Sequence, residues 1–294
     1  MKFINLYKES WGVEPICRTL EVAPSTYYAA ATRPPSAREV KDEELKAEIA
    51  RVHKENFGVY GVEKVWKQLL REGAAVGRDR VARLMIALNL FGVVRGKPRR
   101  TTVPAEADVR PVDLVDRIFT AVAPNLLWVA DLTYVSTWAG TVYVSFVVDV
   151  FSRRIVGWRV SSSLRADLAL DALEMAIWTR GSKALEGLVH HSDRGVQYLS
   201  IRYTERLAEA GAVRSVGSRG DSYDNALAES VVGLFKTELI RMRGPWRTLE
   251  QVELATAEWI DWYNNRRLHS ATGDLPPAEY EAVYYAQREG SAVA

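Results

Sequence analysis

The chain has 294 residues, enough for about two domains, and 48% of them are hydrophobic, an ordinary share for a globular protein. Its single cysteine, Cys17, excludes an internal disulfide, and with only four histidines beside it a zinc site built on cysteine pairs is also excluded. The net charge is +2, and neither a signal-peptide core nor an apolar run near the roughly 18 residues that cross a bilayer is present, so we expect a cytoplasmic protein.

The charge is unevenly spread along the chain. Residues 1–100 carry 19 lysines and arginines against 12 acidic residues, whereas the rest of the chain carries 20 against 25. A basic first part on an acidic second part suggests a module that binds a polyanion, joined to a part that concentrates carboxylates.

The first hundred residues predict short helices. Residues 1–36 form a short helical segment, a possible helix-turn-helix, and apolar residues at helical spacing then predict helices over 42–56, 61–73 and 76–90. The last of these helices carries Arg78, Arg80 and Arg83 opposite its apolar face. We therefore predict a basic, helix-turn-helix-like DNA-binding region over 37–100, whose second helix enters the major groove. A helical bundle with its arginines on a solvated face is the alternative.

A linker and a change of period follow. Residues 101–118 predict the linker, because "TTVPAEADVRP" is rich in proline, threonine and acids without periodicity. Strands are then predicted over 126–136, 141–151, 154–163, 185–193 and 212–216, and helices over 166–180, 201–211 and 224–243. Three antiparallel strands followed by alternating helices and strands predict an α/β fold, a mixed sheet with helices on both faces.

Three carboxylates occupy unusual places in that pattern. Asp131 interrupts a run of strand-forming residues, where an unpaired ionised carboxylate costs on the order of several kcal/mol. Asp193 ends the fourth predicted strand, and Glu229 lies in the second turn of the predicted long helix. Carboxylates clustered in this way need a cation, and two Mg²⁺ ions are the usual solution for phosphodiester chemistry. We predict Asp131, Asp193 and Glu229 as catalytic residues that bind two Mg²⁺ (or Mn²⁺) ions.

Ordered blocks of the second part resemble the DDE transposases of bacterial insertion sequences. They are "WVADLTYV", "VVDVFSRRIVGW", "HHSDRGVQY", "SVGSRGDSYDNALAESVVGLFKTEL" and "WYNNRRLHSATGDLPPAEYE". More narrowly, the chain resembles the second-reading-frame (OrfB) transposase with a retroviral-integrase-like core. The family has 35 residues between its second aspartate and its glutamate, as between Asp193 and Glu229, and a basic residue seven positions later, where Lys236 lies.

The resemblance implies a ribonuclease H-like catalytic core over 119–243 and a C-terminal helical extension over 244–294. It implies a metal-dependent polynucleotidyl transferase that cleaves and transfers strands at the ends of an insertion sequence. The implied partners are double-stranded DNA (terminal repeats and target), further copies of the chain in a homo-oligomer on DNA, and an upstream-frame DNA-binding protein, fused or associated. A nucleoid-associated place in the bacterial cytoplasm is also implied. The alternatives are a ribonuclease H-like nuclease and an element-encoded DNA-binding regulator with an inactive core.

Other polar residues of the second part have roles that the sequence does not decide. Asp149 has a structural role, binding Arg153 or Arg154, or a catalytic one. We expect His190 and His191 to pack or orient rather than bind metal.

The C-terminal blocks contain aromatic and basic residues. Trp259, Trp262 and Tyr263 recur at helical spacing, so we expect them in the core rather than as stacking platforms for bases. Arg266 and Arg267, like Lys236, are predicted to contact DNA, although a helix-terminating surface turn is the alternative for both arginines. Asp224 is predicted to cap the long helix.

Overall fold

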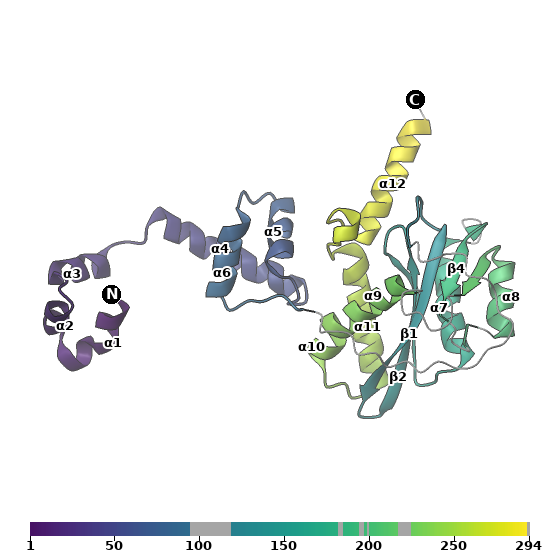
Figure 1. Cartoon of the computed structure of the whole chain (residues 1–294), viewed down its shortest axis with the longest axis horizontal. Helices are drawn as coiled ribbons and strands as arrows, with labels where there is room; N and C mark the ends of the chain where they lie inside the picture. Colours follow the sequence, from purple (N-terminus) through teal and green to yellow (C-terminus); the bar gives the residue numbers. More distant parts are fainter. Residues whose placement is uncertain (95–118, 182–184, 194–196, 199, 217–224, 293–294) are drawn as a thin grey trace. The chain divides into compact units, whose positions relative to one another are not determined.

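The structure, a computed structural model, describes residues 1–94, 119–181, 185–193, 197–198, 200–216 and 225–292 (Figure 1). The chain forms two compact units, Met1–Ala50 and Arg51–Ala294, and the boundary between them falls inside helix α4 (Ala37–Glu55). The predicted linker, the "RGKPRR" segment and Asp224 lie outside the described residues. None of the helices in the described ranges is long and apolar enough to cross a membrane.

The first unit opens with three short helices. They are α1 (Lys2–Trp11), α2 (Val13–Thr19) and α3 (Pro24–Thr32). Ile4, Ile16, Cys17 and Tyr27 form their small core. Gly12 separates α1 from α2 at a φ of 75°, a left-handed conformation that favours glycine.

The second unit begins with a pair of helices joined by a turn. They are α5 (Val62–Arg71) and α6 (Arg78–Ala87), and the face of α6 predicted to be apolar is buried through Val81, Leu84 and Met85. These helices are tied to the C-terminal part of the same unit. The Leu268 N–H donates to the Tyr60 hydroxyl at 2.7 Å, and Lys67 pairs with Asp274 at 3.0 Å.

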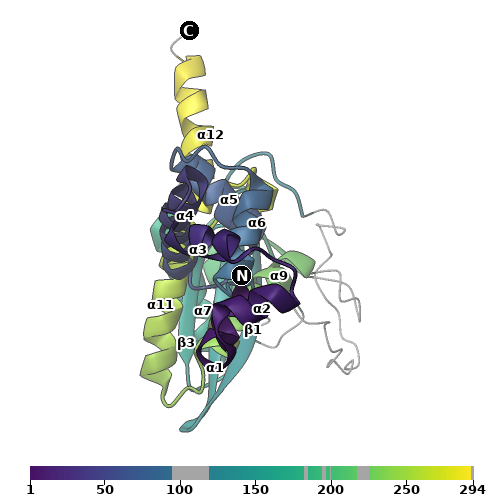
Figure 2. The ribbon, with the colours of Figure 1, turned by 90° about the vertical axis from the view of Figure 1, so that its left-hand side faces the viewer.

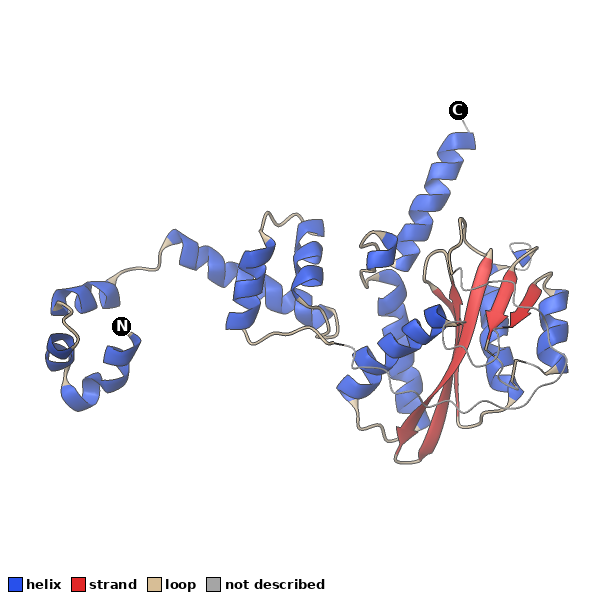
Figure 3. Cartoon of the chain, in the orientation of Figure 1, coloured by secondary structure: helices blue, strands red, loops and turns tan. Residues whose placement is uncertain are grey.

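A five-stranded mixed sheet forms the centre of this unit. Its strands are β1 (Leu127–Thr137), β2 (Gly140–Asp149), β3 (Ile155–Ser161), β4 (Val189–Ser192) and β5 (Val213–Val216), in the order β3-β2-β1-β4-β5. β1–β2 and β2–β3 are antiparallel, whereas β1–β4 and β4–β5 are parallel. With helices on both faces, this sheet confirms the predicted fold class (Figure 3).

Successive residues of β1 face opposite layers of the fold, because side chains alternate along a strand. Trp128 and Ala130 pack with α7 (Ala166–Arg180) and α8 (Ile201–Glu209) in one core cluster. On the other face, Phe146 of β2 contacts Phe235 of α9 (Ala226–Phe235) and Trp259 of α11 (Leu249–Asn265). α11 runs alongside β3 (Figure 2).

The predicted long helix over 224–243 is interrupted. Its α-helical part α9 is followed by a π-helical segment, η2 (Lys236–Ile240), and by the short helix α10 (Arg241–Arg243). Such wide turns inside helices are frequent at functional sites. The chain then continues through α11, the 3-10 turn η3 (Ser270–Thr272) and α12 (Pro277–Ala292). Trp259, Trp262 and Tyr263 are buried in α11, as predicted.

Candidate active site

Asp131 lies where β1 loses its parallel neighbour. β4 pairs with β1 only over Leu127–Ala130, so Asp131 is the first residue of β1 beyond that pairing. On the other edge Asp131 stands opposite Phe146 of β2. Its Oδ1 accepts a hydrogen bond from the Leu132 N–H at 2.8 Å. The carboxylate is therefore half-buried at the end of the parallel part of the sheet, where open α/β sheets place functional groups.

Asp193 and Glu229 come from the two neighbouring elements. Asp193 directly follows β4, and its side chain is exposed. Glu229 is also exposed and lies in the first turn of α9, not the second, because the helix begins at Ala226 rather than at residue 224.

Asn225 links the start of α9 to β1. As the residue before the helix it makes no side-chain cap bond; instead its Nδ2 donates to the Ala130 carbonyl at 2.9 Å. The sequence alone does not indicate this role, since an asparagine before a helix is normally interpreted as a cap. The bond fixes the helix carrying Glu229 to the residue that precedes Asp131.

The three carboxylates share one electrostatic environment. Burial raises the pKa of Asp131 to about 8, and the negative charges of Asp193 and Glu229 contribute to the increase. The Leu132 N–H and the Lys236 ammonium act in the opposite direction. Without a cation, the Asp131 carboxyl therefore keeps its proton to a higher pH than an ordinary aspartate does.

Within the described ranges, no group of three His, Cys, Asp or Glu side chains is arranged to hold a metal ion. The chemistry of the three acids nevertheless fits a hard divalent cation, because Mg²⁺ takes carboxylate oxygens as ligands. A cation among them would offset the repulsion that holds the Asp131 proton.

The paired histidines pack beside β4 and β5. His190 Nε2 lies 3.1 Å from the Tyr203 hydroxyl, and His191 Nδ1 lies 2.9 Å from Ser215 Oγ. Both imidazoles are buried, and burial lowers the pKa of His190 to about 3. Both side chains therefore pack in the interior, and their lack of a metal-binding role stays a prediction.

Tyr198 is a further buried neighbour of the carboxylates that sequence reasoning missed. Burial raises the pKa of its phenol, and the charges of Asp131 and Asp193 add to that effect. Its place in "HHSDRGVQY", five residues after Asp193, is the signal that could have indicated it.

Lys236, the first residue of η2, extends toward β1. Its Nζ is 4.6 Å from the centre of the Tyr134 ring. Burial lowers the pKa of Lys236, and the Asp131 carboxylate opposes that decrease. The structure thus brings Lys236 to the same site as the carboxylates.

Arg267 does not lie where the predicted DNA contact requires. Its side chain is buried, and its guanidinium binds the buried Glu238 carboxylate, with Nε 3.0 Å from Oε2. A guanidinium whose fork already holds a carboxylate is not available to a phosphate on the surface, so we omit Arg267 from the DNA-contacting residues. Arg266 is exposed and lies 3.7 Å from Asp261.

The three arginines of α6 remain on the surface or close to it. Arg78 and Arg83 are exposed and Arg80 is half-buried. Arg78 pairs with Asp79 at 3.2 Å and with Glu63 at 3.5 Å. Exposed pairs of this kind are weak and can exchange for a phosphate.

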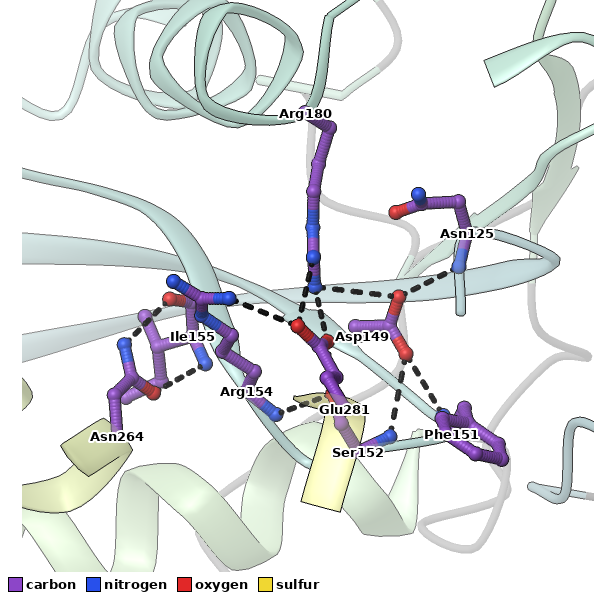
Figure 4. A network of polar contacts seen from close by, with 9 residues as sticks. All are labelled: Asn125, Asp149, Phe151, Ser152, Arg154, Ile155, Arg180, Asn264 and Glu281. Carbon is purple, nitrogen blue, oxygen red and sulfur yellow. Dashed lines mark hydrogen bonds and ion pairs between the residues drawn. The ribbon is translucent and has the colours of Figure 1, made fainter. Parts of the chain in front are cut away.

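Asp149 belongs to a buried network (Figure 4). It stands opposite Trp128, three residues before Asp131 on β1, so its side chain lies on the other face of the sheet from Asp131 and is not part of the carboxylate site. It accepts hydrogen bonds from the N–H groups of Asn125 at 2.7 Å and Phe151 at 2.9 Å, and Arg180 lies 3.7 Å away. Its partner is therefore Arg180, rather than the predicted Arg153 or Arg154, and its role is structural.

Glu281 of α12 completes this network. Its carboxylate binds Arg180, Arg154 at 2.8 Å and the Ser152 hydroxyl at 2.6 Å. Burial would raise the pKa of Glu281, but these hydrogen bonds and the Arg180 charge outweigh burial and keep the pKa below its ordinary value. The network ties α7 and α12 to the turn between β2 and β3.

Known proteins match both parts of the chain. Residues 39–98 match a family described as an HTH-like domain, and residues 121–222 and 211–277 match two described as an integrase core domain. The putative transposase for insertion sequence element IS986/IS6110 of Mycobacterium tuberculosis is 59% identical over 273 residues, which cover 92% of this chain and 98% of that protein. The transposase for insertion sequence element IS629 of Shigella sonnei is 54% identical over 291 residues, 97% of each chain. Among solved structures, the HTLV-2 integrase catalytic core domain in complex with magnesium matches 54% of this chain and 98% of its own, with a TM-score of 0.44 and 16% identity.

Proposed function

Because this chain belongs to the insertion-sequence transposases with an integrase core domain, we propose that it cleaves DNA at the ends of its element and joins those ends to a target. The observation that carries this proposal is the electrostatic coupling of Asp131, Asp193 and Glu229 inside the part that matches the integrase core. A mid-strand carboxylate that is repelled by two others destabilises the fold. Such strongly perturbed groups are typical of catalytic sites, where they are needed for the reaction.

The three carboxylates would hold divalent metal, Mg²⁺ or Mn²⁺. When bound, the metal would activate a water or a 3′-hydroxyl for attack on the phosphodiester and would neutralise charge on the scissile phosphate. Asn225 acts as a positioning residue, because its bond to Ala130 keeps Glu229 beside Asp131. Lys236 places a positive charge at the same site, where it would orient the phosphate next to the cut.

The basic residues of α6 would provide a second, separate contact with DNA. Arg78, Arg80 and Arg83 lie within the segment that matches the HTH-like domain. Arginines on the second helix of such a pair contact bases or phosphates of the major groove. We propose that this contact selects the terminal repeats, with several copies of the chain acting together on DNA and with an upstream-frame protein fused or associated.

A strand-transfer assay tests this function. Labelled DNA carrying the element ends is incubated with a supercoiled target, the full-length protein and Mg²⁺. We expect cleavage at the ends followed by labelled joint molecules. Cleavage without joining would instead indicate a ribonuclease H-like nuclease, and binding without cleavage would indicate a regulator with an inactive core.

A further inference from the structure

We propose that a groove beside the three carboxylates binds unpaired bases of single-stranded DNA. This aromatic groove has a volume of about 440 Å³. One wall is the end of β1 from Tyr134 onward together with Trp138, which follows the strand, and the other includes Lys236, Ile240, Arg241 and residues 244–246. The inference rests on the proposed function, and it specifies the form of DNA that the site takes.

Lys236 connects the groove to the candidate active site. Tyr134 follows Asp131 by three residues on β1, and Lys236 follows Glu229 by seven. Lys236 contributes to both places: it lines the groove, and its charge acts on Asp131. A DNA strand that enters the groove therefore has its next phosphates close to the carboxylates.

Two aromatic rings in this groove are unusually open to solvent. Tyr134 is 58% exposed and Trp138 is 69% exposed, although large aromatic side chains normally bury most of their surface. A cation lies at each ring: Lys236 Nζ is 4.6 Å from the Tyr134 centroid, and the Arg247 guanidinium carbon is 5.1 Å from that of Trp138. Aromatic faces beside cations are how proteins bind single strands, with bases on the rings and phosphates on the charges.

Three cations lie around the groove without a direct ion pair among the residues that the structure describes. Within the described ranges, Lys236, Arg241 and Arg247 form no ion pair with a carboxylate, whereas the buried Arg180 and Arg267 each do. Three cations around an aromatic surface favour a polyanion over an apolar peptide. They also favour unpaired DNA over duplex, because the bases of a duplex are already stacked on each other and cannot lie on the rings.

The walls of the groove are held in place before any ligand binds. The Trp138 N–H donates to the Trp246 carbonyl at 3.0 Å, and the Ala139 N–H donates to the Arg247 carbonyl at 3.1 Å. The Trp246 indole donates to the Ile240 carbonyl at 2.9 Å. Because the two walls are already joined, little ordering is needed on binding.

Binding of short oligonucleotides tests the inference. Fluorescence anisotropy is measured with a labelled 12-nucleotide oligo-dT and a labelled 12-base-pair duplex, using full-length protein in EDTA so that no cleavage occurs. We expect Trp138→Ala and Tyr134→Ala each to weaken oligo-dT binding about tenfold and to change duplex binding less than about twofold. Trp138→Phe keeps a ring and should retain most of the affinity.

Trp178→Ala is the matched control, because Trp178 is 87% exposed on α7, away from the groove. Equal oligo-dT binding by Trp138→Ala and Trp178→Ala would overturn the inference. Equal losses for oligo-dT and duplex would also overturn it, since they would indicate phosphate binding without base stacking. The readout is separate from strand transfer: wild-type protein that binds oligo-dT through Trp138 but never joins DNA would refute the proposed function and leave the groove assignment standing.

Discussion

Asp131→Asn should make the metal-free protein more stable while removing a predicted catalytic group. Asparagine keeps the shape of aspartate but cannot ionise, so the repulsion from Asp193 and Glu229 and the burial of charge both disappear. Active-site groups of this kind reduce stability in return for function.

The size of the gain follows from the Asp131 pKa. That pKa is 3.8 for an ordinary aspartate and about 8 here, so between those values the folded chain holds a proton that the unfolded chain releases. Stability of the wild-type protein therefore falls as the pH rises through this window, at most by about 1.4 kcal/mol per pH unit. At pH 7 the wild-type protein can have lost at most about 4 kcal/mol of its free energy of unfolding in this way. Water around the half-buried carboxylate screens part of it, so we expect about 1–2 kcal/mol, or about 2–6 °C in Tm.

Thermal unfolding in EDTA measures this difference. Wild-type protein, Asp131→Asn and Asp167→Asn are compared at several pH values between 4 and 9; Asp167 is an exposed aspartate on α7 and serves as the control. We expect the advantage of Asp131→Asn to be near zero at pH 4, to grow as the pH rises and to have reached its full value by pH 8, with no such trend for Asp167→Asn. An Asp131→Asn protein that is no more stable than wild type at pH 8 would refute the reasoning.

Three further predictions concern metal, DNA and the buried network. Mg²⁺ or Mn²⁺ should support strand cleavage, whereas Ca²⁺ should support only the binding of DNA, because Ca²⁺ has longer and more flexible coordination. Undiminished cleavage in excess chelator would contradict the metal site. Replacing Arg78, Arg80 and Arg83 together with alanine should flatten the salt dependence of binding to element ends, and unchanged affinity at each salt concentration argues against α6 as the contact. Glu281→Gln should lower the free energy of unfolding by about 2–3 kcal/mol, since the buried Arg180 loses the charge of Glu281 and keeps only the Asp149 carboxylate, 3.7 Å away. Glu279→Gln, which breaks only the exposed pair with Arg71, should change it by less than about 1 kcal/mol in the same denaturation experiment.

Local periodicity predicts most of the elements that position the site. The amphipathic pattern over 166–180 matches α7, and the alternating pattern around Asp131 places that residue inside β1, because both signals depend only on which face of an element is buried. The strands on either side of α7 in sequence, β3 and β4, are predicted for the same reason, although β4 covers only Val189–Ser192 of the predicted 185–193.

Contacts between distant residues are what the sequence does not reveal. Arg267 looks like a surface arginine in "YNNRRLHS", but its fate depends on Glu238, 29 residues earlier, which η2 turns into the interior. Asp149 pairs with Arg180 rather than with the arginines next to it in sequence. Such pairs follow from the packing of α7, α11 and α12 against the sheet, and periodicity within one segment carries no information about them.

Joining of element ends by single-carboxylate variants tests the central claim most directly. Asp131→Asn, Asp193→Asn and Glu229→Gln are compared with Glu250→Gln, whose glutamate is likewise exposed in the first turn of a helix, α11. All proteins are assayed at equal folded concentration with Mg²⁺. We predict that joining disappears in the first three, with binding of the ends and folding retained, and continues at the wild-type level in Glu250→Gln. Joining that survives in Glu229→Gln, or in either aspartate variant, would contradict the assignment of these three residues as the catalytic carboxylates.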